Sequence, residues 1–211
     1  MAGTLSDIGK PEPYPNYFYT EIDGEVRKSV LIDDTPDPDD PRGVRISPTK
    51  YKNGRWLKPD NIPTRLRLEA TDMPVFDFEI LYSGPLISEK MKAVIEGLEL
   101  GIHQFWPMQI EPESQPGRVV ATKYFLVVGQ RIDSVHRGLT VPEIEPPLSY
   151  LDLGRAGSRL VLDLTRIAGR HLWVDSYVCN ELLLSGRLIA ALEEADCTGW
   201  QIQQMIEEII A

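Results

Sequence analysis

The sequence predicts an α+β protein in which two amphipathic helices pack on a mostly antiparallel sheet. Two observations predict this class. Residues 86–108 and 183–205 share a strand-helix-strand pattern at a constant offset of 97 positions, and residues 75–84 alternate apolar and polar side chains at strand spacing. The chain has 211 residues, of which 42% are hydrophobic and 26% charged, so it can bury a sizeable core.

Each predicted helix starts after a serine, a residue type that caps helix N-termini. Apolar residues recur at i, i+3, i+4 and i+7 from Met91 after Ser88, and the same spacing starts at Leu188 after Ser185. We therefore expect Met91 and Leu188 to be buried at equivalent places in a pseudo-repeated unit. The expected helices lie near 88–98 and 181–195.

The remaining regular structure is predicted to be strand, with one ambiguity at the C-terminal end. The unit repeat predicts a strand after residue 200, whereas the apolar spacing from Ile202 to Ile210 fits a helix. Both alternatives remain open for residues 200–210. The other candidate strands are "NYFYTEI" (16–22), "GVRISP" (43–48), "VFDFEILYSG" (75–84) and "YFLVVGQRI" (124–132).

The chain divides by composition near residue 75. Ten of the 17 prolines precede this position, and the segment 1–74 holds only short candidate strands between turn residues. We expect 1–74 to be a loop-rich segment packed on one α+β domain formed by 75–211.

A proline-rich run of aspartates lies within the N-terminal segment; we call it the acidic loop. It comprises Asp33, Asp34, Asp37, Asp39 and Asp40. Its ligand spacing does not fit a calcium loop, and Pro36, Pro38 and Pro41 predict an extended, exposed conformation. The loop is therefore a solvated linker, an electrostatic lure for a cationic partner, or a direct contact with such a partner.

The charge distribution limits the class of partner. The net charge is −10, and a second acidic cluster near the C-terminal end contains Glu193, Glu194 and Asp196. Such a charge argues against nucleic acid and anionic lipid as partners. The chain shows no signal sequence and no apolar run long enough to cross a bilayer, so we expect a cytoplasmic protein.

No catalytic or metal-binding motif is evident, so we expect a protein that is not an enzyme and needs no cofactor. The three histidines are scattered, and neither cysteine has a zinc-ligand spacing. A small hydrolase using Asp133, His136 or Cys179 is the alternative, although a polar turn and a buried thiol are the simpler interpretations. Trp56, which is flanked by Arg55 and Lys58, is a candidate exposed anchor for a partner.

Three stretches carry a resemblance to a known family. They are "LISEKMKAVIEGLELGIHQFWPMQIE" (86–111), "YFLVVGQRIDSVHRG" (124–138) and "HLWVDSYVCNELLLSGRLIAALEEADCTGWQI" (171–202). Over about residues 75–205 the chain resembles the immunity-protein family of bacterial polymorphic toxin systems, formerly a domain of unknown function with a myxobacterial namesake. The acidic loop lies outside this resemblance.

The resemblance implies a protein that binds and neutralises a cognate toxin in the cytoplasm by occluding its active site. The toxin would present a cationic face to the acidic inhibitor. A scaffold or adaptor of a secretion system is a further alternative to this function. The candidate contact residues are the acidic loop, Trp56, Glu193, Glu194 and Asp196.

Overall fold

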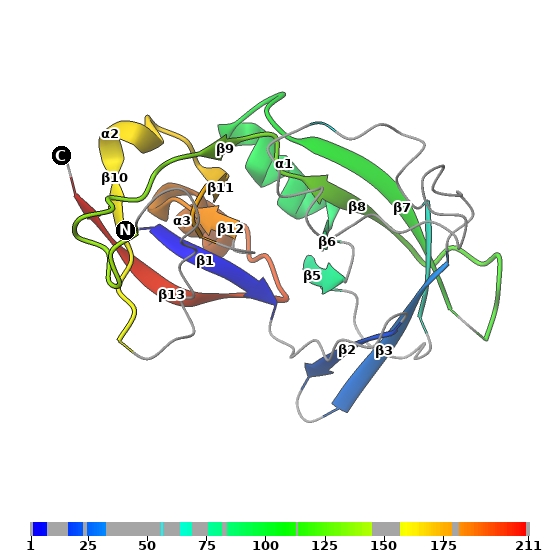
Figure 1. Ribbon diagram of the computed structural model, residues 1–211. Helices are drawn as coiled ribbons and strands as arrows, with labels where there is room; N and C mark the ends of the chain where they lie inside the picture. Colours follow the sequence, from blue (N-terminus) through cyan, green and yellow to red (C-terminus); the bar gives the residue numbers. More distant parts are fainter. Residues whose placement is uncertain are drawn as a thin grey trace.

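The computed structural model confirms the α+β class, with strands in two sheets and three helices among the described residues (Figure 1). Most of the chain from residue 84 onward is described, together with shorter stretches before it. The described residues are 2–7, 17–22, 25–32, 56, 64–68, 76–81, 84–112, 114–144, 157–178 and 182–209. No helix in these ranges is long and apolar enough to span a membrane.

The first sheet has seven strands in the order β2-β3-β4-β7-β8-β6-β5. All neighbours are antiparallel except β4 and β7, which run parallel. Its strands are β2 (Tyr17–Ile22), β3 (Glu25–Ile32), β4 (Arg65–Leu68), β5 (Phe78–Leu81), β6 (Gly84–Ile87), β7 (Gln104–Pro112) and β8 (Ala121–Val127).

The second sheet has six strands in the order β10-β13-β1-β12-β11-β9. The pairs β10 with β13 and β11 with β9 are parallel, and the others are antiparallel. Its strands are β1 (Ala2–Asp7), β9 (Arg131–Ile132), β10 (Val161–Asp163), β11 (Leu172–Asp175), β12 (Leu182–Leu184) and β13 (Trp200–Ile209). The N-terminal strand β1 therefore lies in the middle of a sheet built from the C-terminal part of the chain.

The two predicted helices are α1 (Glu89–Leu98) and α3 (Gly186–Glu194), and a short helix α2 (Leu164–Ile167) lies between β10 and β11. The side chain of Ser88 accepts a hydrogen bond from the backbone N–H of Met91, and Ser185 accepts one from Leu188. Each serine thus satisfies a backbone donor that the first helical turn leaves without a partner. The expected range 181–195 was too long, because residues 182–184 form β12.

The pseudo-repeat extends from the helices to the strands around them. The strand order β4-β7-β8-β6-β5 in the first sheet corresponds to β10-β13-β1-β12-β11 in the second, with the same sequence of parallel and antiparallel pairings. Leu86 and Ile87 pair with β8, and the residues 97 positions later, Leu183 and Leu184, pair with β1. The strand β1 therefore occupies in the second unit the place that β8 has in the first.

The ambiguous segment after residue 200 is a strand, as the repeat predicts. It pairs with β1 along Trp200–Ile206 and with β10 along Glu207–Ile209, which satisfies its backbone through two neighbours. The register shifts between Thr4 and Leu5, so Gln203 has no opposite residue and forms a bulge. A bulge interrupts the two-residue period, and it lies within the spacing from Ile202 to Met205 that imitated a helix.

The two units share one hydrophobic core. Met91 and Leu188 are both buried in it, as the repeat predicts, and Leu126 of β8 and Leu184 of β12 contribute from the two sheets. Successive residues of a strand point to opposite faces, so Phe125 and Leu183 join two further cores on the other sides of the sheets. At β8 and β12 the two sheets therefore carry buried residues on both faces, and α1 and α3 lie between the sheets, whereas Ile167 of α2 belongs to an outer core.

Three details differ from the sequence-based expectations or lie beyond the described residues. The strands form two sheets rather than one, because β1 pairs with both β12 and β13 and joins them into a separate sheet. The predicted strand 124–132 is interrupted after Val127, and its last part forms β9 in the other sheet. The predicted strand 43–48 falls outside the described residues, while 16–22 corresponds to β2.

Candidate functional site

The acidic cluster at the end of α3 is exposed and lies beside the start of α1. Glu193, Glu194 and Asp196 are all exposed. The Nζ of Lys90 donates a hydrogen bond to the backbone carbonyl of Asp196 at 2.7 Å and forms an ion pair with Asp77 at 2.8 Å. A cation from the other unit therefore offsets part of the negative charge that the sequence places here.

Asp77 connects the two units at this end of the helices. Its Oδ1 accepts a hydrogen bond from the Ser88 hydroxyl at 2.6 Å, and its Oδ2 accepts one from the Thr198 backbone N–H at 2.8 Å. Burial raises the pKa of the Asp77 carboxyl, but hydrogen bonds from Lys90, Ser88 and Thr198 outweigh this and hold the pKa below its usual value. Both carboxylate oxygens of Asp77 bind groups of the same chain, so we infer that Asp77 stabilises the fold.

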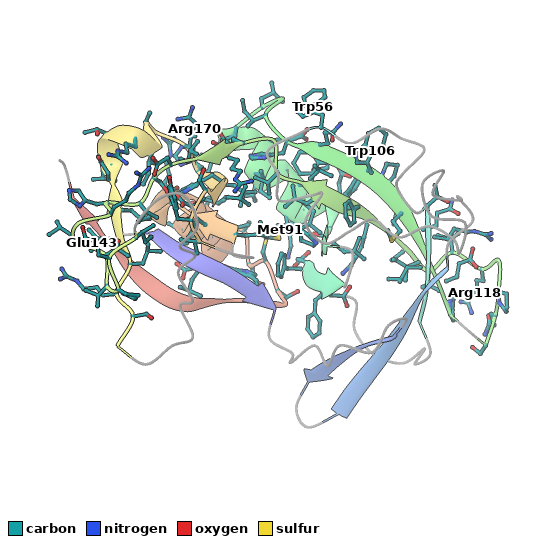
Figure 2. All side chains as sticks on the ribbon, viewed as in Figure 1. Trp56, Met91, Trp106, Arg118, Glu143 and Arg170 are labelled. Carbon is teal, nitrogen blue, oxygen red and sulfur yellow. The ribbon has the colours of Figure 1, made fainter. Side chains whose placement is uncertain are left out.

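Trp56 is exposed, as the sequence predicts, and lies near the other end of α1 (Figure 2). Its side chain is 65% exposed, and two apolar neighbours in the turn after α1 are also exposed, Leu100 by 81% and Ile102 by 40%. A Cβ added to Gly129 would lie 3.4 Å from Trp56 Nε1 and 1.7 Å from the carbonyl oxygen of Ile102. The absence of a side chain at Gly129 therefore lets the turn and the indole approach the same point of the backbone.

A buried hydrogen-bond network centred on Glu99 lies beneath this turn. Glu99 is the C-cap of α1, and its Oε2 accepts from His103 Nε2 and from the backbone N–H of Leu172, each at 2.9 Å. Its Oε1 accepts from Gln130 Nε2 at 2.7 Å and from the backbone N–H of His171 at 2.9 Å. One carboxylate thus joins α1, the segment before β9 and β11.

The protonation of this network follows from its donors. The backbone N–H of Gly129 donates to His103 Nδ1 at 3.2 Å, so Nδ1 is the acceptor of the ring and Nε2 is the nitrogen that donates to Glu99. Burial raises the pKa of the Glu99 carboxyl, but hydrogen bonds from His103, His171 and Gln130 outweigh this and hold the pKa below its usual value. Glu99 is therefore a buried anion stabilised by hydrogen-bond donors.

The predicted contact residues fall in separate places. Lys90 in the first turn of α1 contacts Asp196, whereas Trp56 lies beside the turn that follows the last residue of α1. A ten-residue helix is about 15 Å long, so the acidic cluster and Trp56 are separated by roughly that distance. The acidic loop lies outside the described residues, and its relation to either place stays a prediction.

The segment that suggested a hydrolase has other structural roles. The hydroxyl of Ser134 donates to Asp175 Oδ2 at 2.6 Å and accepts from Trp173 Nε1 at 3.0 Å, within a fully buried cluster. Asp133 forms an ion pair with Arg137 at 2.7 Å. Asp175 and Trp173 therefore fix the orientation of the Ser134 hydroxyl within the buried cluster.

The remaining candidates for chemistry are His136 and the cysteines. His136 is half-buried, and its Nδ1 is buried with no hydrogen-bond partner among the described residues. Cys179 lies outside the described residues, while burial, followed by the charge of Asp77, raises the pKa of the Cys197 thiol to about 11. Within the described ranges, no group of three or more His, Cys, Asp or Glu side chains could hold a metal ion.

Sequence reasoning missed the Glu99 network and the exposed turn above it. The i, i+4 spacing of Glu99 and His103 was a usable local signal, but Gln130, His171 and Leu172 come from distant segments. The residues Leu100 and Ile102 flank Gly101, which has a φ of 73° in the left-handed region that glycine tolerates. A glycine turn with apolar residues on both sides was the signal for an exposed apolar surface.

Comparison with known proteins assigns the family. No curated protein is significantly similar to this sequence. The sequence matches the family described as the immunity protein family (Imm11) over residues 20–207, which is most of the chain, although β1 precedes the match. The chain therefore belongs to the Imm11 immunity protein family.

Proposed function

We propose that this protein neutralises a cognate bacterial toxin by binding it in the cytoplasm and covering its active site. The family assignment carries this proposal, because an immunity protein protects its producer from a particular toxin. We further propose that the toxin belongs to a polymorphic or contact-delivered system. Neutralisation by occlusion requires only a complementary surface, with no catalytic step by the inhibitor.

The charge of the chain supports a toxin with a cationic face. The net charge is −10, and Glu193, Glu194 and Asp196 are exposed at one end of the helix pair. Complementary charge speeds the encounter of two proteins and disfavours partners of the same sign. Nucleic acid and anionic membranes are therefore poor partners for this surface, and a basic protein is a suitable one.

The proposal is tested by expressing the toxin encoded beside this gene, with and without this chain. We expect the chain to restore growth and to co-purify with the toxin as a stable complex. A matched control is the immunity protein of an unrelated toxin from the same expression vector, which should give neither result. Rescue of growth without a detectable complex would contradict occlusion.

Two other outcomes separate the alternative functions. A hydrolase would remove the toxin's product or modify the toxin. Because an enzyme turns over repeatedly, it would protect at far less than one chain per toxin molecule. A scaffold of a secretion system would bind the toxin but leave its activity intact in a purified mixture. Either outcome would overturn neutralisation by direct coverage of the active site.

A further inference from the structure

Three large apolar side chains form an exposed surface at the end of α1, which we call the Trp56 patch. It comprises Trp56, Leu100 and Ile102, of which Leu100 is 81% and Trp56 is 65% exposed. Large aromatic and aliphatic side chains gain free energy when they leave water, and tryptophan is enriched among residues that dominate binding interfaces. Such a group is therefore suited to contact another protein.

The patch is held in place by the structure beneath it. The carbonyl oxygen of Ile102 lies so close to Gly129 that a Cβ there would be 1.7 Å away, and Trp56 Nε1 lies against the same glycine. The next residue after the turn, His103, is fixed by its bonds to Glu99 and to the Gly129 N–H. A preorganised surface loses less conformational entropy when it binds.

The charge beneath the patch is negative. Glu99 is a buried carboxylate, and His103 is its single ion-pair neighbour among the described residues. The last turn of α1 contains no basic residue, so no cation of the helix itself offsets the negative end of the helix dipole. Arg55 and Lys58, which flank Trp56 in the sequence, lie outside the described residues. The face of an exposed indole also attracts cations. An apolar group flanked by a lysine or arginine matches both properties.

We propose that the Trp56 patch is the principal contact with the cognate toxin, which inserts an apolar side chain flanked by a lysine or arginine. This inference rests on the proposed function. Leu100 and Trp56 provide the apolar contact, and the C-terminal end of α1 with Glu99 attracts the toxin's cation. The acidic loop and the acidic cluster at the end of α3 then speed the first encounter with the toxin and do not form the final contact.

The test measures the affinity of the full chain for the purified toxin encoded beside its gene. We expect Trp56→Ala and Leu100→Ser each to weaken binding at least ten-fold, mainly through faster dissociation. Leu139→Ser is the matched control, because Leu139 is 44% exposed in a different turn. All variants should unfold at the same temperature as the wild type, since the replaced side chains are exposed.

A second pair of variants tests the charge. Leu100→Lys and Leu100→Glu remove the same apolar contact and differ in sign, so a cationic toxin predicts that Leu100→Lys binds at least three-fold more weakly than Leu100→Glu. The difference in affinity between these two variants should become smaller in 1 M salt, because salt screens the charges. Equal affinities, or a weaker Leu100→Glu, would overturn the cationic part of the proposal.

The remaining outcomes are distinguishable. If the wild type binds the toxin and Trp56→Ala binds equally well, the patch is not the contact and the proposed function stands. If the wild type does not bind, both proposals fail. A wild-type dimer in the absence of toxin that Leu100→Ser converts to a monomer would assign the patch to a second copy of this chain and refute the toxin contact.

Discussion

Replacing Glu99 by glutamine tests the buried network that joins the two units. Each carboxylate oxygen accepts two hydrogen bonds, so a glutamine amide would direct its NH₂ group at two donors in either orientation. His103 cannot relieve the conflict by moving its proton to Nδ1, because the Gly129 N–H already donates to that nitrogen. The substitution therefore leaves buried donors without acceptors.

The expected loss is large for an isosteric substitution. Two hydrogen bonds to a charged group contribute about 3–6 kcal/mol together, and the lower cost of burying a neutral amide offsets part of this, so we expect a loss of at least about 2 kcal/mol. Urea unfolding followed by circular dichroism measures it. Glu96→Gln is the control: its side chain is 33% exposed and 3.6 Å from Lys92, so we expect a loss below about 0.5 kcal/mol.

The stability that Glu99 contributes should also depend on pH in a defined direction. The pKa of Glu99 is lowered in the folded state, so its contribution is present above the unfolded value of about 4.3 and is lost as the pH falls through the folded pKa. The difference in unfolding free energy between the wild type and Glu99→Gln should therefore shrink below about pH 4. An effect of Glu99→Gln no larger than that of Glu96→Gln at pH 7 would refute the reasoning.

Three further predictions concern the shared core, the thiol and the acidic loop. Met91→Ala and Leu188→Ala should each lower the unfolding free energy by about 2–5 kcal/mol, and a loss below about 1 kcal/mol at either would contradict equivalent burial. In a Cys179→Ser background, Cys197 should react with a disulfide reagent at pH 8 at least ten-fold more slowly than free cysteine, because its raised pKa leaves little thiolate. An equal rate would show that the pKa of this half-buried thiol is not raised. Replacing the five aspartates of the acidic loop by asparagine should slow association with the toxin ten-fold or more at low salt, with little effect in 1 M salt, where the screening length is about 3 Å. Unchanged association would identify a solvated linker, and faster dissociation would identify a direct contact.

The local features of the fold could be predicted from the sequence. Ser88 and Ser185 precede apolar residues at helical spacing, and both cap their helices as expected. The repeat also predicted the strand after residue 200, where the spacing of isoleucines alone suggested a helix. Matching patterns in two units constrain the structure more than one pattern does, because each unit must form the same pairings.

The sheet arrangement could not be predicted in the same way. Residues 2–7 carry no strong strand pattern, and they form β1 because β12 and β13 offer pairing partners nearly 200 residues away. The Glu99 network is likewise assembled from positions 99, 130 and 171, which no local pattern connects. The exposure of Trp56 was predictable because its charged sequence neighbours disfavour burial.

The central claim is that the protein neutralises its toxin by direct stoichiometric binding. The most direct measurement is a titration of the purified toxin's activity with the purified chain at toxin concentrations well above the dissociation constant. Our account predicts a linear loss of activity that reaches zero at one chain per toxin and returns when the complex is dissociated. Full activity at a several-fold excess of the chain, or complete inactivation by a small fraction of one equivalent, would contradict it.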